Sequence, residues 1–307
     1  MWQYASGAFL GWGLGSNDAA NVFGTGVATQ LVRFRTAAVL IAIFVLLGAG
    51  LEGPKCIHTV GGLSELHPAL AFFCTLAAGL VMFTMSRLAL PSSSSQAIVG
   101  ALVAVGLTNH SADFSILTKI VLCWILTPIG AGIISIAFYL ALSFLLRPLL
   151  NNIGWRTPVL RIAIIVSGCY GSYALGSNNV ANVSGVYVGT GQMTPFVASL
   201  FGGFFIAVGV LTYGKNVMMT VGKGIFPLDP FTAFIAVLAQ ATTTHIFTQI
   251  GVPVSGSQAI VGAVIGIGLL KDMGALGKKK IAEILLGWLL TPVSGGLICY
   301  LLIALFL

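Results

Sequence analysis

Two polar motifs interrupt the apolar sequence, and each occurs twice. GSNDAAN at residues 15–21 returns as GSNNVAN at residues 176–182. PSSSSQAIVG at residues 91–100 returns as PVSGSQAIVG at residues 253–262. The copies lie 161 residues apart in the first pair and 162 in the second, counted from residues 15 and 176 and from residues 91 and 253. Because order and spacing are both kept, the chain is an internal duplication.

The composition places both copies in a membrane. Of 307 residues, 57% are hydrophobic and 7% are charged, against about 25% charged residues in soluble domains. Apolar stretches of roughly 20 residues, the length that crosses a bilayer, recur throughout. The net charge of +7 is spread over short loops without a basic, aromatic-rich patch, which argues against nucleic acid as a partner. We predict an all-α polytopic membrane protein embedded in a lipid bilayer.

Each half of the duplication divides into five apolar segments. Only a Pro and one or two small residues separate the third and fourth segments, which predicts a helical hairpin that either crosses the bilayer or is re-entrant. In both cases each half crosses an odd number of times, so the two repeats should have inverted topology. We predict a first repeat over residues 1–146, a cytoplasmic linker over 147–160 and a second repeat over 161–307. The segments are 4–30, 36–50, 69–90, 93–107 and 119–146, then 161–192, 194–213, 230–251, 254–270 and 281–307.

The basic residues predict the orientation. When the loops are numbered alternately, 11 of the 14 Lys and Arg residues fall on one side and only Lys55 and Lys119 on the other, with Arg87 near the first hairpin tip. The positive-inside rule makes the basic side cytoplasmic. Both termini are then extracytoplasmic, in a multi-pass protein of the plasma (inner) membrane.

The first motif predicts a cation site. Inverted repeats with polar breaks near mid-membrane are typical of secondary transporters, and Gly, Ser, Asn and Asp disfavour a continuous helix, so we expect the helix to be broken there. Unwound carbonyls with Asn17, Asp18 and Asn21 would supply hard oxygen ligands for an alkali cation. Of the seven Asp and Glu residues, only Asp18 lies in the middle of a predicted apolar segment. A carboxylate at such a place in a membrane usually has a function. The alternative is a structural Asp paired with neighbouring amides. Its counterpart Asn179 keeps the oxygen but not the charge.

The second motif predicts an anion site. Each copy stands just before an apolar helix, where a Ser N-cap and the N-terminal dipole, about +0.5 charge, favour an anion. The alternative is that these serines are ordinary caps. A divalent oxyanion with an ionised Asp18 carries −3, and two helix termini return about +1. About two cations are therefore needed, which we place near the first motif and around Asn178 and Asn182.

These motifs resemble a known family. GSNDAAN and GSNNVAN resemble the G-A-N-D-V-A-N signature of the inorganic phosphate transporter (PiT) family, and the two hairpin motifs resemble its P-V-S-T-T-H motif. The resemblance covers nearly the whole chain. It implies a cation-coupled phosphate importer, with two hairpins meeting around the anion, a homodimer and an elevator-like motion. Carried over by position, Asn17, Asp18, Asn21, Asn178, Asn179 and Asn182 would line the cation and anion region, and Ser93, Ser94, Ser95, Ser255 and Ser257 would hold the anion. We add Gln96 and Gln258 to the predicted anion site, take the six Asn and Asp residues as the cation site, and place Na⁺ on Asp18, Asn17 and Asn178.

Three departures from the family pattern bear on the substrate and the coupling ion. The second family Asp is Asn179, the hairpin His is Gln96 and Gln258, and the His before the second signature is Leu175. Sulfate carriers also belong to the family. Hydrogen phosphate can donate a hydrogen bond and sulfate cannot, so an acceptor such as Asp18 or a Gln oxygen favours phosphate.

The sequence thus predicts import of inorganic phosphate with Na⁺ or H⁺ as the coupling ion. A sulfate permease is the alternative within the family, and an uncoupled anion channel the alternative from another class. The chain contains no Ser/His/Asp set, metal cluster or nucleotide loop, so neither catalysis nor a cofactor is expected.

Overall fold

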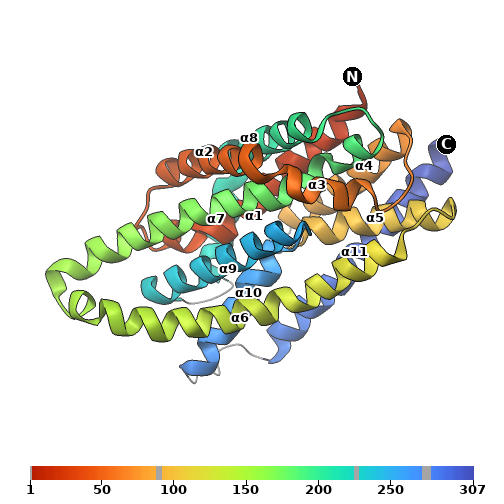
Figure 1. Cartoon of the computed structure of the whole chain (residues 1–307). Coiled ribbons are helices and arrows are strands. Elements are labelled where there is room, and N and C mark those ends of the chain that lie inside the picture. Colours follow the sequence, from red (N-terminus) through yellow and green to blue (C-terminus); the bar gives the residue numbers. More distant parts are fainter. Residues whose placement is uncertain (1, 88–91, 225–227, 272–277) are drawn as a thin grey trace.

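The computed structural model describes residues 2–87, 92–224, 228–271 and 278–307 and is all-helical over these ranges (Figure 1). It contains a short helix, Pro54–Gly61, that the sequence did not predict. The other helices overlap the predicted segments, although several of them are longer than predicted. The helices are α1 Ala5–Ala28, α2 Phe34–Glu52, α3 Pro54–Gly61, α4 Pro68–Arg87, α5 Ser94–Thr108, α6 Phe114–Leu150, α7 Ile153–Gly189, α8 Pro195–Gly224, α9 Pro230–Ile250, α10 Gly256–Leu270 and α11 Lys278–Phe306, after a short 3-10 turn at Trp2–Tyr4.

Membrane character is confirmed by helix length and hydropathy. Among the described residues, seven helices are long and apolar enough to cross a bilayer: α2, α4, α6, α7, α8, α9 and α11. The hairpin helices α5 and α10 have 15 residues each, about 22 Å at 1.5 Å per residue, which is shorter than the ~30 Å hydrocarbon core. The chain is a multi-pass integral membrane protein.

The expected break in the helix at the first motif is not present. Both copies lie inside continuous helices, α1 and α7. Some polar side chains bond within their own helix: Ser16 donates to the carbonyl of Gly13 at 2.8 Å, and Asn182 donates to Asn179 at 2.9 Å. Asn17 and Asn178 bond to neighbouring helices instead. Because these side chains have partners other than the backbone of the motif, the backbone hydrogen bonds of the helix need not open.

The predicted linker 147–160 is helical apart from its middle. α6 continues to Leu150, α7 begins at Ile153, and Asn152 caps α7 by accepting from the N–H of Gly154 at 2.9 Å. This turn lies at the end of the molecule opposite both termini (Figure 1). The two halves therefore run in opposite overall directions, in agreement with inverted topology, which stays a prediction.

The two halves are interleaved. α1 packs mainly on α8 and α2 on α7, while α5 packs on α11 and α6 on α10, so each contact recurs with the halves exchanged. Glycines make these approaches possible, since an added Cβ would collide with the facing backbone. The facing pairs are Gly15 with Ile206 and Gly176 with Val45, then Gly100 with Pro292 and Gly262 with Pro128.

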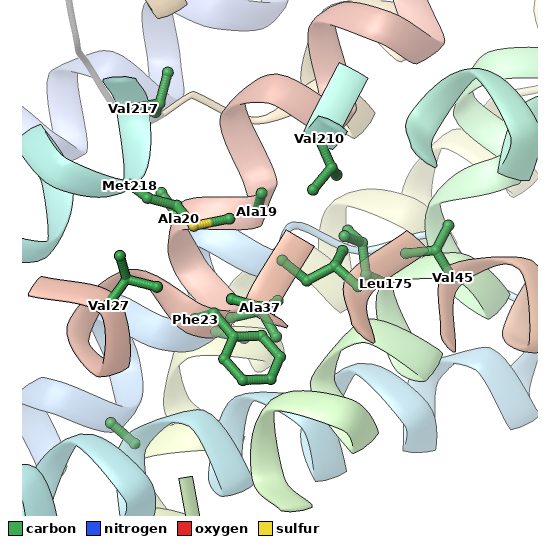
Figure 2. Packing of buried hydrophobic residues seen from close by; sticks show 14 of the residues in the cluster. Ala19, Ala20, Phe23, Val27, Ala37, Val45, Leu175, Val210, Val217 and Met218 are labelled. Carbon is green, nitrogen blue, oxygen red and sulfur yellow. The ribbon is translucent and has the colours of Figure 1, made fainter. Parts of the chain in front are cut away.

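One hydrophobic cluster surrounds the first motif. Ala20 and Phe23 of α1 pack with Leu175 of α7 and with Val210 and Met218 of α8 (Figure 2). The Leu175 position, where the family often has His, therefore contributes to packing. Outward-facing Leu, Ile and Val side chains on α6 and α11 form an apolar surface suited to lipid.

Candidate functional site

Ser93 and Ser255 cap the two hairpin helices, as predicted. The Ser93 hydroxyl accepts from the backbone N–H of Gln96 at 3.3 Å, and the Ser255 hydroxyl from that of Gln258 at 3.2 Å. Each cap hydroxyl also bonds to the serine two residues on, at 3.1 Å to Ser95 and at 2.9 Å to Ser257. The predicted anion residues at each tip therefore form a buried cluster of hydroxyls at a helix N-terminus.

The two hairpin tips meet. The hydroxyl of Ser257, in the first turn of α10, donates to the carbonyl of Ser92, immediately before the cap of α5, at 3.1 Å. Both residues are buried. Pro91, the first residue of the first hairpin motif, lies outside the described residues. This contact brings two helix N-termini from opposite halves into one buried region.

Asn178 of α7 holds the second hairpin tip. Its Nδ2 donates to the Thr248 hydroxyl at 3.1 Å and to the Val252 carbonyl at 3.2 Å, and its Oδ1 accepts from the Val254 N–H at 2.8 Å. Its counterpart Asn17 donates to the Ser86 hydroxyl of α4 at 3.2 Å. These two predicted cation residues thus connect the first motifs to the hairpins.

Asp18 and Asn179 occupy matched places on α1 and α7. Asn21 donates to Asp18 at 3.5 Å, and Asn182 donates to Asn179 at 2.9 Å. Asn182 also reaches across the halves to the Ser94 hydroxyl of α5 at 3.5 Å. Among the described residues, no hydrogen bond joins Asp18 to either hairpin. GSNNVAN, the second copy of the first motif, therefore contacts the serine cluster of the first hairpin through Asn182. Asp18, in the first copy, lies beside Asn21 of its own helix.

Several buried polar atoms have no hydrogen-bond partner among the described residues. An unpaired buried group costs about 1–3 kcal/mol, so such atoms indicate a bound water, ion or ligand. Four belong to predicted site residues. The atoms are Gln96 Oε1, Trp124 Nε1, Asn179 Nδ2, Asn182 Oδ1, Gln240 Oε1, Thr244 Oγ1 and Gln258 Oε1.

The sequence did not point to Gln240 or Thr244 as site residues, and Thr244 was expected to hydrogen-bond between helices instead. Both lie on α9, the first helix of the second hairpin, and both are buried. The available signal was the polar run QATTT at residues 240–244 inside an apolar segment, where the first half has only apolar residues and Gly at the matched positions.

A second polar network joins α2 to α9 through His245, for which the sequence favours hydrogen bonds between helices over proton transfer. Glu52 accepts from Nε2 of His245 at 2.7 Å and pairs with Lys55 at 2.9 Å, while Nδ1 of His245 bonds to the Tyr170 hydroxyl at 2.9 Å. This network is half-buried and connects the end of α2 to the second hairpin. It involves none of the predicted anion or cation residues.

Comparisons with known proteins identify a family for the sequence and a solved structure with the same fold. The sequence profile described as "Phosphate transporter family" matches residues 14–299. A predicted phosphate permease of Methanocaldococcus jannaschii is 30% identical over 94% of this chain and 92% of its own. The sulfate permease CysP of Bacillus subtilis is 29% identical over 97% of this chain and 86% of its own. A solved structure titled "The sodium-dependent phosphate transporter" has the same fold, with a TM-score of 0.88 at 24% identity over 99% of this chain and 98% of that one.

Proposed function

The chain belongs to the phosphate transporter family, and from this premise we propose that it imports inorganic phosphate by secondary active transport, with Na⁺ as the coupling ion. Its relatives are named as permeases and transporters, and it is of transporter type rather than an enzyme. H⁺ is the other candidate for the coupling ion. Either ion would be a co-substrate rather than a resident cofactor.

The observation that carries the proposal is the meeting of the two hairpin tips. Ser257 of one tip donates to the Ser92 carbonyl of the other at 3.1 Å, so two helix N-termini, each worth about +0.5 charge, share one buried region. Backbone N–H groups and hydroxyls gathered at helix N-termini bind phosphate-like anions. Ser94 and Ser95, with the side-chain amides of Gln96 and Gln258, supply donors around that region.

Cations would complete the charge balance. A divalent oxyanion with ionised Asp18 leaves about −2 after two helix termini are counted, so we propose about two Na⁺ ions. Asp18 and Asn17 would bind one of them, with Asn21 beside them. The second Na⁺ would bind near α7. Asn178 would coordinate it through the lone pair of Oδ1 that does not accept from Val254, next to Asn179 and Asn182. Binding of the cations would then create the anion site and couple the two fluxes.

Sulfate transport is the second candidate. The observation in its favour is the relative named a sulfate permease, which aligns with 97% of this chain. Against it stand the unpaired buried oxygens of Gln96, Gln258 and Asn182, which are acceptors and suit an anion that carries a hydroxyl hydrogen. We therefore rank phosphate first.

Uptake into proteoliposomes tests the proposal. Labelled phosphate is offered with an inward Na⁺ gradient, with a pH gradient, or with neither, and unlabelled phosphate or sulfate competes. Accumulation that requires Na⁺ and is blocked by phosphate supports the proposal. Uptake blocked by sulfate alone would assign the sulfate permease, and equilibration that never exceeds the outside concentration under any gradient would assign an uncoupled channel.

Orientation and assembly complete the proposal. The basic α6–α7 turn, with Arg147 and Arg156, lies opposite the termini, which favours a cytoplasmic turn and extracytoplasmic termini in the plasma membrane (Figure 1). We propose a homodimer, following the family resemblance. Protease or label access to a tag at either terminus in intact cells tests the orientation.

A further inference from the structure

The two hairpins are not equivalent at the start of their second helices. Ser94 begins α5, and its hydroxyl accepts from Asn182 of α7 at 3.5 Å. The matched first residue of α10 is Gly256, which has no side chain to offer. On the preceding helices the difference is reversed, since α9 has Gln240 where α4 has Ala78. In the first hairpin the polar side chain is Ser94 on the second helix, whereas in the second hairpin it is Gln240 on the first helix.

Gln240 lies against the space that Gly256 leaves free. A Cβ placed on Gly256 would lie 3.3 Å from Nε2 of Gln240, so the side-chain amide lies beside the first residue of α10. Gly256 stands between the cap Ser255 and Ser257, whose hydroxyls bond at 2.9 Å. Gln240 is only 4% exposed, and its Oε1 has no partner among the described residues. The Nε2 of Gln240 thus lies beside the N-terminus of α10, and the Oε1 of the same amide is buried and unpaired.

Thr244 continues the same face of α9, one turn along. Its hydroxyl is buried and has no hydrogen-bond partner among the described residues. One turn further, Thr248 bonds to Asn178 of α7 at 3.1 Å, so this face of α9 is directed at the GSNNVAN motif. Thr243, on the neighbouring face, has its hydroxyl bonded to the carbonyl of Ala239 at 2.8 Å. Unpaired polar atoms on α9 are therefore found on the face that lines the site.

We propose that Gln240, assisted by Thr244, contacts the transported anion and selects an oxyanion that carries a hydroxyl hydrogen. This inference rests on the proposed phosphate transport and deepens it. A side-chain amide offers both a donor and an acceptor, whichever way it is turned. Hydrogen phosphate both accepts and donates hydrogen bonds, whereas sulfate only accepts them. The acceptor of Gln240 would be satisfied by phosphate and left unpaired by sulfate, which disfavours sulfate.

The test measures selectivity and stability in the same variants. Gln240→Met and Thr244→Val remove the polar atoms at nearly constant volume. Since these atoms are unpaired in the free protein, their removal should leave the thermal unfolding midpoint unchanged or raise it. The KM for phosphate should rise about three- to tenfold, the effect of one lost neutral hydrogen bond, and the inhibition constant for sulfate should change less. Thr243→Val is the matched control, because its hydroxyl is bonded within α9, and its KM should stay at the wild-type value.

The outcomes separate this inference from the proposed function. A wild-type protein that accumulates sulfate and not phosphate overturns both. A wild-type protein that accumulates phosphate, with an unchanged phosphate-to-sulfate ratio in Gln240→Met, overturns the inference alone. The same holds if Gln240→Met shifts only the Na⁺ concentration for half-maximal uptake, because Gln240 would then be a cation ligand. A raised phosphate KM, a lowered phosphate-to-sulfate preference and an intact unfolding midpoint support it.

Discussion

The Oδ1 of Asn178 on α7 accepts a hydrogen bond from the backbone N–H of Val254, 76 residues further along the chain, at 2.8 Å. The same side chain donates to the carbonyl of Val252 at 3.2 Å, so one amide pairs with two backbone groups of the segment between α9 and α10. Val252 and Val254 are fully buried, where unpaired backbone groups are costly. A residue predicted as a cation ligand therefore also holds the tip of the second hairpin in place.

Substitution of Asn178 should destabilise the protein. Asn178→Ala leaves the N–H of Val254 unpaired and removes a partner from the Val252 carbonyl, at a cost of about 1–3 kcal/mol for each unpaired buried group. The thermal unfolding midpoint in detergent should fall accordingly. Asn151→Ala, at the exposed turn between α6 and α7, is the control and should leave the midpoint within error. Equal midpoints for the two variants would contradict a holding role for Asn178.

Removal of the charge on Asp18 should abolish accumulation without unfolding the protein. Asp18→Asn is nearly isosteric, and the matched residue of the other half, Asn179, shows that an amide fits such a place, since it accepts from Asn182 at 2.9 Å. Gradient-driven uptake should be lost while the unfolding midpoint is kept. Glu65→Gln removes an exposed loop carboxylate and serves as the control. Normal accumulation by Asp18→Asn would remove Asp18 from the coupling mechanism.

Two matched glycines should be intolerant of a single methyl group. A Cβ on Gly15 would collide with the backbone of Ile206, and one on Gly176 with the backbone of Val45. Backbone cannot rotate away as a side chain can, so each of Gly15→Ala and Gly176→Ala should destabilise the fold by more than the usual cost of overpacking, about 1–3 kcal/mol. Both variants should therefore give a lower yield of folded protein on size-exclusion chromatography. Gly287→Ala on α11 has open space around it and should be neutral or stabilising by about 0.5–1 kcal/mol. A normal yield of Gly15→Ala would show that α1 and α8 lie further apart than described.

The base of the second hairpin should contribute a pH-dependent stability. Burial alone would raise the pKa of Asp229, but the hydrogen bond and charge of Lys271 and the N–H of Thr232 lower it below its ordinary value. The contribution is therefore present above the unfolded-state pKa, about 3.9, and is lost as the pH falls through the lower folded-state pKa. The side chains of Asp229 and Lys271 are both partly exposed, so their ion pair contributes only about 0–1 kcal/mol to stability.

Asp229→Asn separates this charge effect from helix capping. Asp229 also caps α9, accepting from the N–H of Phe231 at 3.0 Å, and Asn caps a helix about as well. Wild type should be slightly more stable than Asp229→Asn at pH 7. The difference should begin to shrink near pH 4 and vanish once the pH lies below the folded-state pKa of Asp229. A difference that persists at low pH would assign the effect to the cap.

The membrane character, the duplication and the hairpin caps could be predicted because they depend on local sequence. Apolar runs of bilayer length define the spans whatever their neighbours are, and the repeated motifs are visible by alignment of the chain with itself. Ser93 and Ser255 cap their helices through bonds to residues three positions away, a range at which sequence predicts contacts well. The residues of these motifs that were predicted as ligands are buried, and their binding roles stay predictions.

The remaining features depend on partners distant in the chain. Sequence propensity predicted broken helices at both GSN motifs. Hydrogen bonds within the motifs and to the hairpins hold several of these side chains, and the glycines pack against the other half, so α1 and α7 stay continuous. The side chain of Gln240 lies beside Gly256, 16 residues along the chain, a contact that the local sequence pattern does not reveal. Local pattern decided where helices and polar motifs lie. Only tertiary packing decided which polar atoms find partners and which remain free for a ligand, because that depends on what the opposite half places against them.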